Sequence, residues 1–182
     1  MRFVACALIV FLAGCGLGEA VSPLIAAARA GNVEEIKRLA AARVDLNEPG
    51  GVNHWTPLMH AVHKNQAAAL EALIEAGAQV NAVSGNTTAL ILAAGYGETD
   101  IVKLLLDHGA DPKLAVKPGA TALAAAVGGS RDPDHPTAGK CQTDTVRLLL
   151  ERDASLLIPG DSDAVQAARQ GGCAEVVALV TK

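Results

Sequence analysis

The sequence predicts an all-α solenoid of about five stacked helix-turn-helix repeats with β-turn fingers, and three observations lead to it. Residues 88–111 divide into two short helical segments, because apolar residues recur three or four positions apart in each. Glycines separate these segments, and Gly109 follows the second as a helix C-cap does. The unit also recurs, since Thr88 follows Thr56 by 32 residues and precedes Thr121 by 33. A helix pair this small cannot bury both of its faces alone, so the copies are expected to stack.

Residues at equivalent positions of the repeats carry a family resemblance. Residues 56–61 read Thr-Pro-Leu-Met-His-Ala, which is close to the T-P-L-H-x-A signature of the ankyrin repeat. At the two ends of the chain, residues 22–31 and 162–171 match without a gap. On these motifs the chain resembles the ankyrin-repeat family over residues 22–182, which implies that family's stacked helix pairs. The expected repeats are about 22–50, 51–83, 84–115, 116–158 and 159–182.

The first residues of the chain have a different character. Met1 and Arg2 precede an uninterrupted apolar run at 3–13, which is too short to span a bilayer comfortably and is typical of a secretory leader. The run ends in Leu-Ala-Gly-Cys at 12–15, which resembles the lipobox of bacterial lipoproteins. The resemblance implies a signal peptide at 1–14, acylation of Cys15 and a lipid-anchored linker at 15–21. The alternatives are an ordinary signal peptide cut elsewhere and an N-terminal core helix.

The resemblance to lipoproteins also implies a location. Gly16 follows Cys15 where an inner-membrane retention signal places aspartate, so we expect a periplasmic protein anchored by acyl chains to the outer membrane of a Gram-negative host. Without residues 1–14 the chain keeps 14 of its 15 basic and all 19 acidic residues, a formal charge of −5. This charge argues against nucleic acid as a partner, because nucleic-acid binding needs a basic stripe.

Individual elements follow from the same pattern. The second helix of repeat one is predicted at Val33–Ala41, with Ile36 and Leu39 facing inward. By the resemblance, His60 donates a hydrogen bond to backbone between repeats and is not a ligand. His108 falls at the end of a second helix, where a cation is favourable to the helix dipole.

Repeat four departs from the period. Residues 144–150 align with 100–106 at a spacing of 44, which is one period plus eleven residues, and the surplus occupies 130–140. Two prolines, a glycine and several charges predict a surface loop there. Such insertions often meet a partner, the alternative being a tolerated loop without a role. Two aspartates and a histidine in the insertion do not predict a metal site, because no other ligands stand at matching spacing.

Two cysteines remain after the leader and the lipidated residue are set aside. Cys141 and Cys173 each fall at or just before the start of a second helix, in neighbouring repeats. An even pair of cysteines in an oxidising compartment predicts a disulfide. Stacked repeats lie about 10 Å apart, as packed helices do, and the insertion beside Cys141 gives it slack to approach Cys173. The alternative is a pair of buried free thiols.

The sequence holds none of the short catalytic motifs that we considered: G-x-S-x-G, H-E-x-x-H, paired C-x-x-C or a phosphate loop. The family resemblance implies a non-enzymatic protein without cofactors, which binds a folded partner protein in its concave groove. One hypothesis is an immunity protein that neutralises a toxin effector such as a lipase. The other is an accessory factor that supports or stabilises a periplasmic enzyme, for example in oxidative stress defence.

The resemblance also names the residues of the groove, which are finger residues and the two positions before the mid-repeat glycine. Trp55 and Tyr96 are the only aromatics after the leader, and we expect both to anchor the partner. Basic residues gather on this surface, which favours an acidic patch on the partner. The alternative is a solvated face with Trp55 packed against the next finger. The expected contacts are Arg29, Asn53, Trp55, His63, Lys64, Ser84, Thr87, Tyr96, Lys117, Arg131, His135, Arg169 and Gln170.

Overall fold

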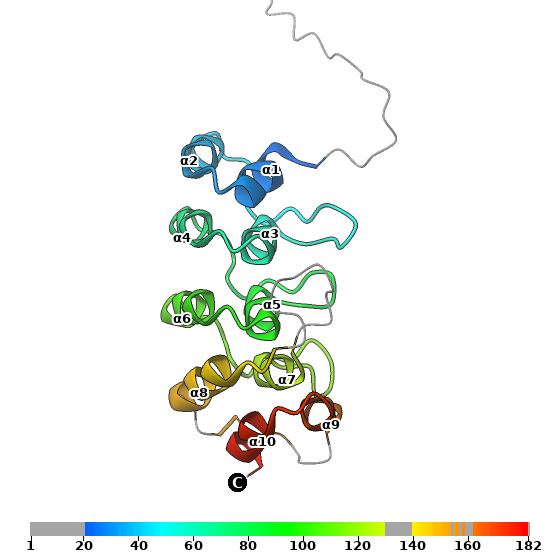
Figure 1. Ribbon diagram of the computed structural model, residues 1–182. Coiled ribbons are helices and arrows are strands. Elements are labelled where there is room, and N and C mark those ends of the chain that lie inside the picture. Colours follow the sequence, from blue (N-terminus) through cyan, green and yellow to red (C-terminus); the bar gives the residue numbers. More distant parts are fainter. Residues whose placement is uncertain (1–20, 130–139, 154, 157, 159–161, 182) are drawn as a thin grey trace, which may run out of the picture.

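The computed structural model describes residues 21–129, 140–153, 155–156, 158 and 162–181, and these form one stack of helix pairs (Figure 1). The predicted leader, Cys15 and residues 130–139 of the insertion lie outside this description. First helices form one layer: α1 (Pro23–Ala30), α3 (Pro57–His63), α5 (Ala89–Tyr96), α7 (Ala122–Gly128) and α9 (Asp163–Gln170). Second helices form the other: α2 (Val33–Ala41), α4 (Ala67–Glu75), α6 (Thr99–Asp107), α8 (Thr143–Arg152) and α10 (Ala174–Val180). The predicted all-α repeat solenoid is confirmed, and no helix among the described residues could cross a membrane.

The first helix of every repeat begins at a hydroxyl N-cap. The side chain of the capping residue accepts a hydrogen bond from the backbone N–H three residues on, which satisfies one of the free donors of the helix end. Loss of such a cap typically costs about 1 kcal/mol. These N-caps are Ser22, Thr56, Thr88, Thr121 and Ser162.

The core lies between the two layers and continues through all five repeats. Ile36 and Leu39 are buried in α2, as the sequence predicts. The position of Leu39 is buried in every second helix. Each fully buried side chain of this size contributes about 1.5–3 kcal/mol. The residues at this position are Leu39, Leu73, Leu105, Leu149 and Val180.

Two asparagines fix the spacing between repeats. The Oδ1 atom of Asn47 accepts from the backbone N–H of Gln79 at 2.8 Å. One repeat later, Oδ1 of Asn81 accepts from the N–H of Asp111 at 2.9 Å, and its Nδ2 donates to the carbonyl of Gly109 at 3.0 Å. Each asparagine therefore connects the end of one repeat to the same place in the next.

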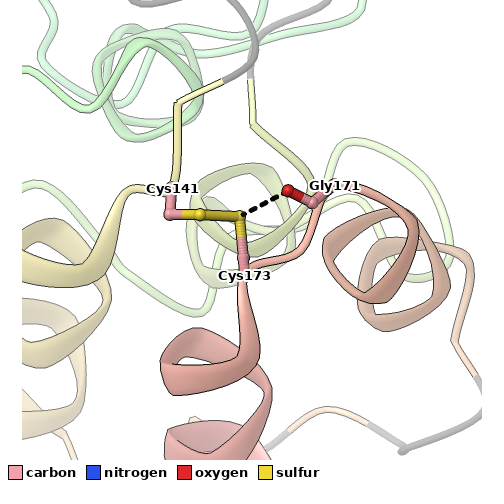
Figure 2. Close-up of a disulfide and its surroundings, with 3 residues drawn as sticks. All are labelled: Cys141, Gly171 and Cys173. Atoms are coloured by element: carbon pink, nitrogen blue, oxygen red, sulfur yellow. Dashed lines mark hydrogen bonds between the residues drawn. A yellow bond between two sulfur atoms is a disulfide. The ribbon is translucent and has the colours of Figure 1, made fainter.

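A disulfide joins the last two repeats, as the sequence predicts (Figure 2). Cys141 lies just before α8, Cys173 is the N-cap of α10, and their Cα atoms are 5.5 Å apart. The carbonyl oxygen of Gly171 lies 3.9 Å from the sulfur of Cys173. Since a disulfide sulfur carries no hydrogen, this approach is a contact and not a hydrogen bond.

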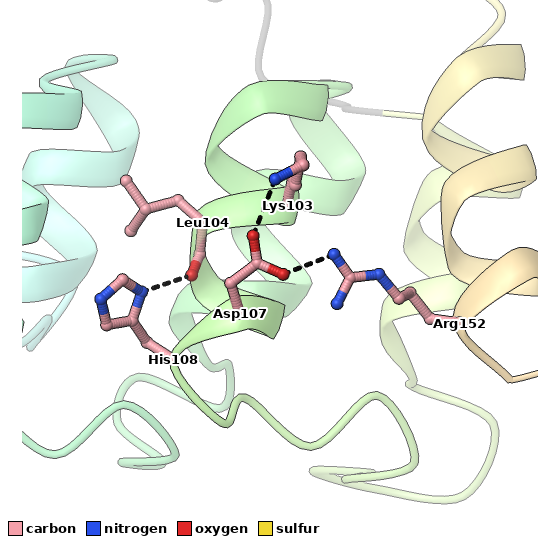
Figure 3. A network of polar contacts seen from close by, with 5 residues as sticks. All are labelled: Lys103, Leu104, Asp107, His108 and Arg152. Carbon is pink, nitrogen blue, oxygen red and sulfur yellow. Dashed lines mark hydrogen bonds and ion pairs between the residues drawn. The ribbon is translucent and has the colours of Figure 1, made fainter.

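Ion pairs connect repeats three, four and five along the second helices. Asp107 of α6 accepts from Lys103 on its own helix at 2.8 Å and from Arg152 of α8 at 2.5 Å (Figure 3). Arg147 of α8 pairs with Glu175 of α10. His108 ends α6, and its Nδ1 lies 2.9 Å from the carbonyl of Leu104, in agreement with its predicted place at the helix end.

Candidate protein-binding surface

Two β-turn fingers precede α3 and α5 and pack against each other. Antiparallel bridges close them, between Gly50 and Trp55 in the first and between Ser84 and Thr87 in the second. The Ser84 hydroxyl donates to the carbonyl of His54 in the first finger. Gly85 lies so close to the Trp55 indole that a Cβ there would stand 2.9 Å from its Cδ1 atom. Trp55 is thus packed against the next finger, the alternative that the sequence left open.

Trp55 also begins a column of rings that runs from repeat two into repeat three. The ring centroids of Trp55 and His63 are 5.3 Å apart, and those of His63 and Tyr96 are 5.8 Å apart. The Nδ1 atom of His63 lies within hydrogen-bond distance of the Tyr96 hydroxyl, at 3.0 Å. His60 meets the edge of Trp55 at 5.8 Å. We call Trp55, His60, His63 and Tyr96 the aromatic column.

The structure corrects two predicted contacts. Tyr96 is 5% exposed and Thr87 is 8% exposed, so neither side chain can serve as an accessible anchor. Tyr96 is buried because it ends α5 and packs on His63 of the preceding repeat. Thr87 is buried because it closes the base of the second finger.

The other predicted contacts that the structure describes are at least partly accessible. Trp55, His63 and Ser84 are half-buried. Arg131 and His135 lie outside the described residues. The exposed members are Arg29, Asn53, Lys64, Lys117, Arg169 and Gln170.

Two exposed apolar residues at the fingers escaped prediction. Val52 is 90% exposed in the first finger and Val83 is 55% exposed in the second. They adjoin the predicted contacts Asn53 and Ser84 in sequence. The available signal was a β-branched apolar residue within a polar turn, where no core is near enough to bury it.

The groove side and the back of the stack differ in charge. The first helices carry Arg29 and Arg169 against one acidic residue, Asp163. The second helices carry nine acidic and five basic residues. Lys64 adds a further cation at the end of α3. The first-helix side is therefore basic relative to the acidic back.

Burial and the basic groove side both act on the pKa of His60. Its Nε2 atom is 3.1 Å from the carbonyl of Gly50, so it donates to backbone as predicted, at the base of its own finger. Burial lowers the pKa of His60, and the nearby charges of Arg29 and Lys64 lower it further, while the Gly50 carbonyl acts in the opposite direction. The residue is consequently a structural histidine in its neutral form.

The arrangement offers a binding surface. Within the described ranges, no group of three or more His, Cys, Asp or Glu side chains is placed to hold a metal ion. The surface combines accessible cations, fingertip valines and a half-buried tryptophan. Of these, arginine and tryptophan are among the residue types that dominate binding energy at protein interfaces.

Comparison with known proteins agrees with this geometry. A family model described as ankyrin repeats (3 copies) matches residues 4–84 and 81–159. Zygote-specific protein 3 of Chlamydomonas reinhardtii is 36% identical over 69% of this chain. An ankyrin repeat protein of Rickettsia felis is 25% identical over 74% of it, and the human 2-5A-dependent ribonuclease is 43% identical over 40%.

The aligned parts cover only 35%, 43% and 10% of these three relatives, so the chain spans less than half of each. The ribonuclease match in particular covers a tenth of that protein and carries no evidence of catalysis here. The family model, by contrast, matches far more than half of the chain. The chain belongs to the ankyrin-repeat family, whose stacks are protein-interaction modules.

Proposed function

We propose that the chain is a non-enzymatic, lipid-anchored binding protein of the periplasm that holds a folded partner in its concave groove. The observation that carries the proposal is the basic groove side, where the exposed Arg29 and Lys64 act on His60, whose ring meets the half-buried Trp55. Arginine and tryptophan are enriched among residues that dominate binding energy. Opposite charges across an interface speed association and select the partner.

The basic groove predicts that the partner presents an acidic patch. Replacing Arg29 and Lys64 together by glutamate is expected to weaken binding at least about tenfold, because two attractions become repulsions. Lys37→Glu on the exposed face of α2 is the matched control for either single groove substitution, since it makes the same charge change on the back. The partner is first recovered from membranes by crosslinking. The measurement is then the Kd of each variant for that partner. Equal losses from groove and back variants would contradict the proposal.

The lipid anchor rests on the leader and on the Leu-Ala-Gly-Cys sequence that ends at Cys15. Each buried methylene of an acyl chain contributes about 0.8 kcal/mol, so two or more chains hold a protein firmly on a membrane. Cys15→Ser is expected to move the protein from the membrane pellet to the soluble periplasmic fraction. A Cys15→Ser protein that still sediments with membranes would exclude this anchor.

Within this function, immunity against a delivered toxin is the version that we favour. A membrane-tethered binder stands where a membrane-directed lipase would arrive, and binding in a groove can mask a catalytic surface without chemistry. The second candidate is an accessory factor for a resident periplasmic enzyme, for example in oxidative stress defence. The neighbouring gene separates them, because an immunity protein is expected beside a secreted toxin. In the decisive assay the toxin is produced in the periplasm, and only cells with the intact chain survive.

A further inference from the structure

A hollow of about 390 Å³ opens on the first-helix layer between α7 and α9. Small residues form its floor, namely Ala124, Ala125 and Gly128 from α7 with Ala164 and Ala167 from α9. Its lining is more apolar than polar. We call this cavity the α7–α9 hollow.

At two of the lining positions, repeat four carries small residues where repeat two carries large ones. Counted from the N-cap of each first helix, Ala125 and Gly128 occupy the positions of His60 and His63 in repeat two. In repeat two those positions are filled by the aromatic column. In repeat four the same two positions line the hollow.

Charged residues stand on two sides of the hollow. Lys117 lines it from the turn before α7; this side chain is exposed and pairs with no acidic group among the described residues. Asp163 lines it from the first turn of α9, where the helix N-terminus favours a negative charge. An apolar occupant with one acidic group would therefore lie with its acid toward Lys117 and away from Asp163.

We infer that the α7–α9 hollow receives one large apolar side chain from a loop of the partner protein, with an acidic residue of that loop on Lys117. This rests on the proposed function and names the kind of partner segment. The volume lies near the lower end of ligand sites, about 300–1,000 Å³, and suits a single aromatic side chain. Binding energy concentrates where such a side chain fills a desolvated pocket.

The test is an NMR titration of the full, ¹⁵N-labelled chain with a blocked pentapeptide that has phenylalanine at its centre and acidic residues around it. Amide shifts are expected to centre on Lys117, Ala124 and Ala164. The same peptide with alanine at its centre is expected to bind at least about tenfold more weakly. No shifts at these residues up to the solubility limit, or shifts centred on Arg29 and Lys64, would overturn the inference.

Two variants of the chain sharpen the test. Ala125→Leu fills the hollow with the residue that repeat three carries there, Leu92, and is expected to weaken peptide binding at least about tenfold. Ala68→Leu on the exposed side of α4 is its matched control and is expected to bind as the parent chain does. Lys117→Glu is expected to abolish binding of the acidic peptide and to bind more tightly a peptide whose acidic residues are replaced by lysine. If Ala125→Leu unfolds, this variant is the one that tests the inference. Unchanged binding by these hollow variants would overturn the inference.

Failure of the inference can be told from failure of the proposed function. If the Arg29 and Lys64 variant loses the membrane-derived partner while Ala125→Leu and Lys117→Glu keep it, the groove binds protein but the hollow does not. If none of the groove variants loses that partner, both the inference and the groove proposal fail.

Discussion

Repeats one to three and repeats four and five use the same helix pairs but hold them together differently. In the first part, neighbouring fingers pack through Trp55 and Ser84, and the aromatic column crosses from repeat two to repeat three. In the second part, a disulfide and the Arg147–Glu175 ion pair take this role, and the Arg152–Asp107 pair crosses the junction to repeat three. A last repeat has only one neighbour and buries less surface, so covalent and ionic links are most useful at that end.

The largest expected effect comes from removing the covalent link. The disulfide spans a sequence separation of 32 residues, for which the chain-entropy model gives roughly 3–4 kcal/mol. Replacing Cys141 and Cys173 by serine should therefore destabilise α8 to α10 strongly while repeats one to three keep their protection. Hydrogen exchange followed by mass spectrometry measures both parts in one sample. The reduced parent chain, which also lacks the link, is the control and should behave as the serine variant does. Uniform protection along the chain in both of these samples would remove the distinction between the two parts.

The corresponding test in the first part is Trp55→Ala. Truncating a fully buried tryptophan costs about 3–5 kcal/mol, and because Trp55 is half-buried we expect about 2 kcal/mol. The loss should appear at α3, α5 and the two fingers, since Trp55 contacts His63 and Gly85. Urea denaturation gives the free energy of unfolding, with Trp55→Phe as the milder control. A loss confined to α8–α10 would show that the column does not connect the first repeats.

The smallest expected effect is a selective response to mild acid. The pKa of His60 is lowered in the folded chain, mainly by burial, so the unfolded chain binds this proton more readily. The stability from neutral His60 is present above its ordinary pKa of about 6.5 and is lost as the pH falls. Hydrogen exchange at pH 7.5 and 5.5, corrected for intrinsic rates, should show lower protection of α3 at the lower pH.

The ion pairs of Asp107, at the junction between the two parts, should not respond over that range. Hydrogen bonds from Lys103 and Arg152 lower the pKa of Asp107 to about 2 (Figure 3). The stability that ionised Asp107 contributes is therefore fully present above the ordinary aspartate pKa and is lost only as the pH falls toward 2. His60→Gln keeps a donor for the Gly50 carbonyl without a titrating group, so it should abolish the response at α3. Equal acid loss in both parts would contradict the assignment to His60.

Features set by neighbouring positions in sequence could be predicted. The bounds of α2, its buried Ile36 and Leu39, and the role of His60 follow from helical periodicity, caps and a short motif. The Cys141–Cys173 pair could be found because the repeat period places both residues at the same level of adjacent helix pairs.

Exposure across repeats could not be predicted in the same way. Tyr96 looked like an accessible anchor, but His63 of the preceding repeat covers it. The exposure of Val52 depends on how far the finger stands from any core. The α7–α9 hollow is lined by small residues. The repeat period identifies equivalent positions, but it does not show how much space their side chains leave between the helices.

The disulfide has a consequence for how the chain carries mechanical load. If the N-terminus is fixed to a membrane and a partner pulls on the groove, the repeats are loaded in series. Residues between Cys141 and Cys173, a separation of 32, are bypassed by the covalent link and cannot lengthen. At about 3.3–3.6 Å per extended residue, this withholds roughly 100 Å of chain. Extension under load is thus confined to residues outside this loop, which include the first three repeats and α7, while α8 stays joined to the start of α10.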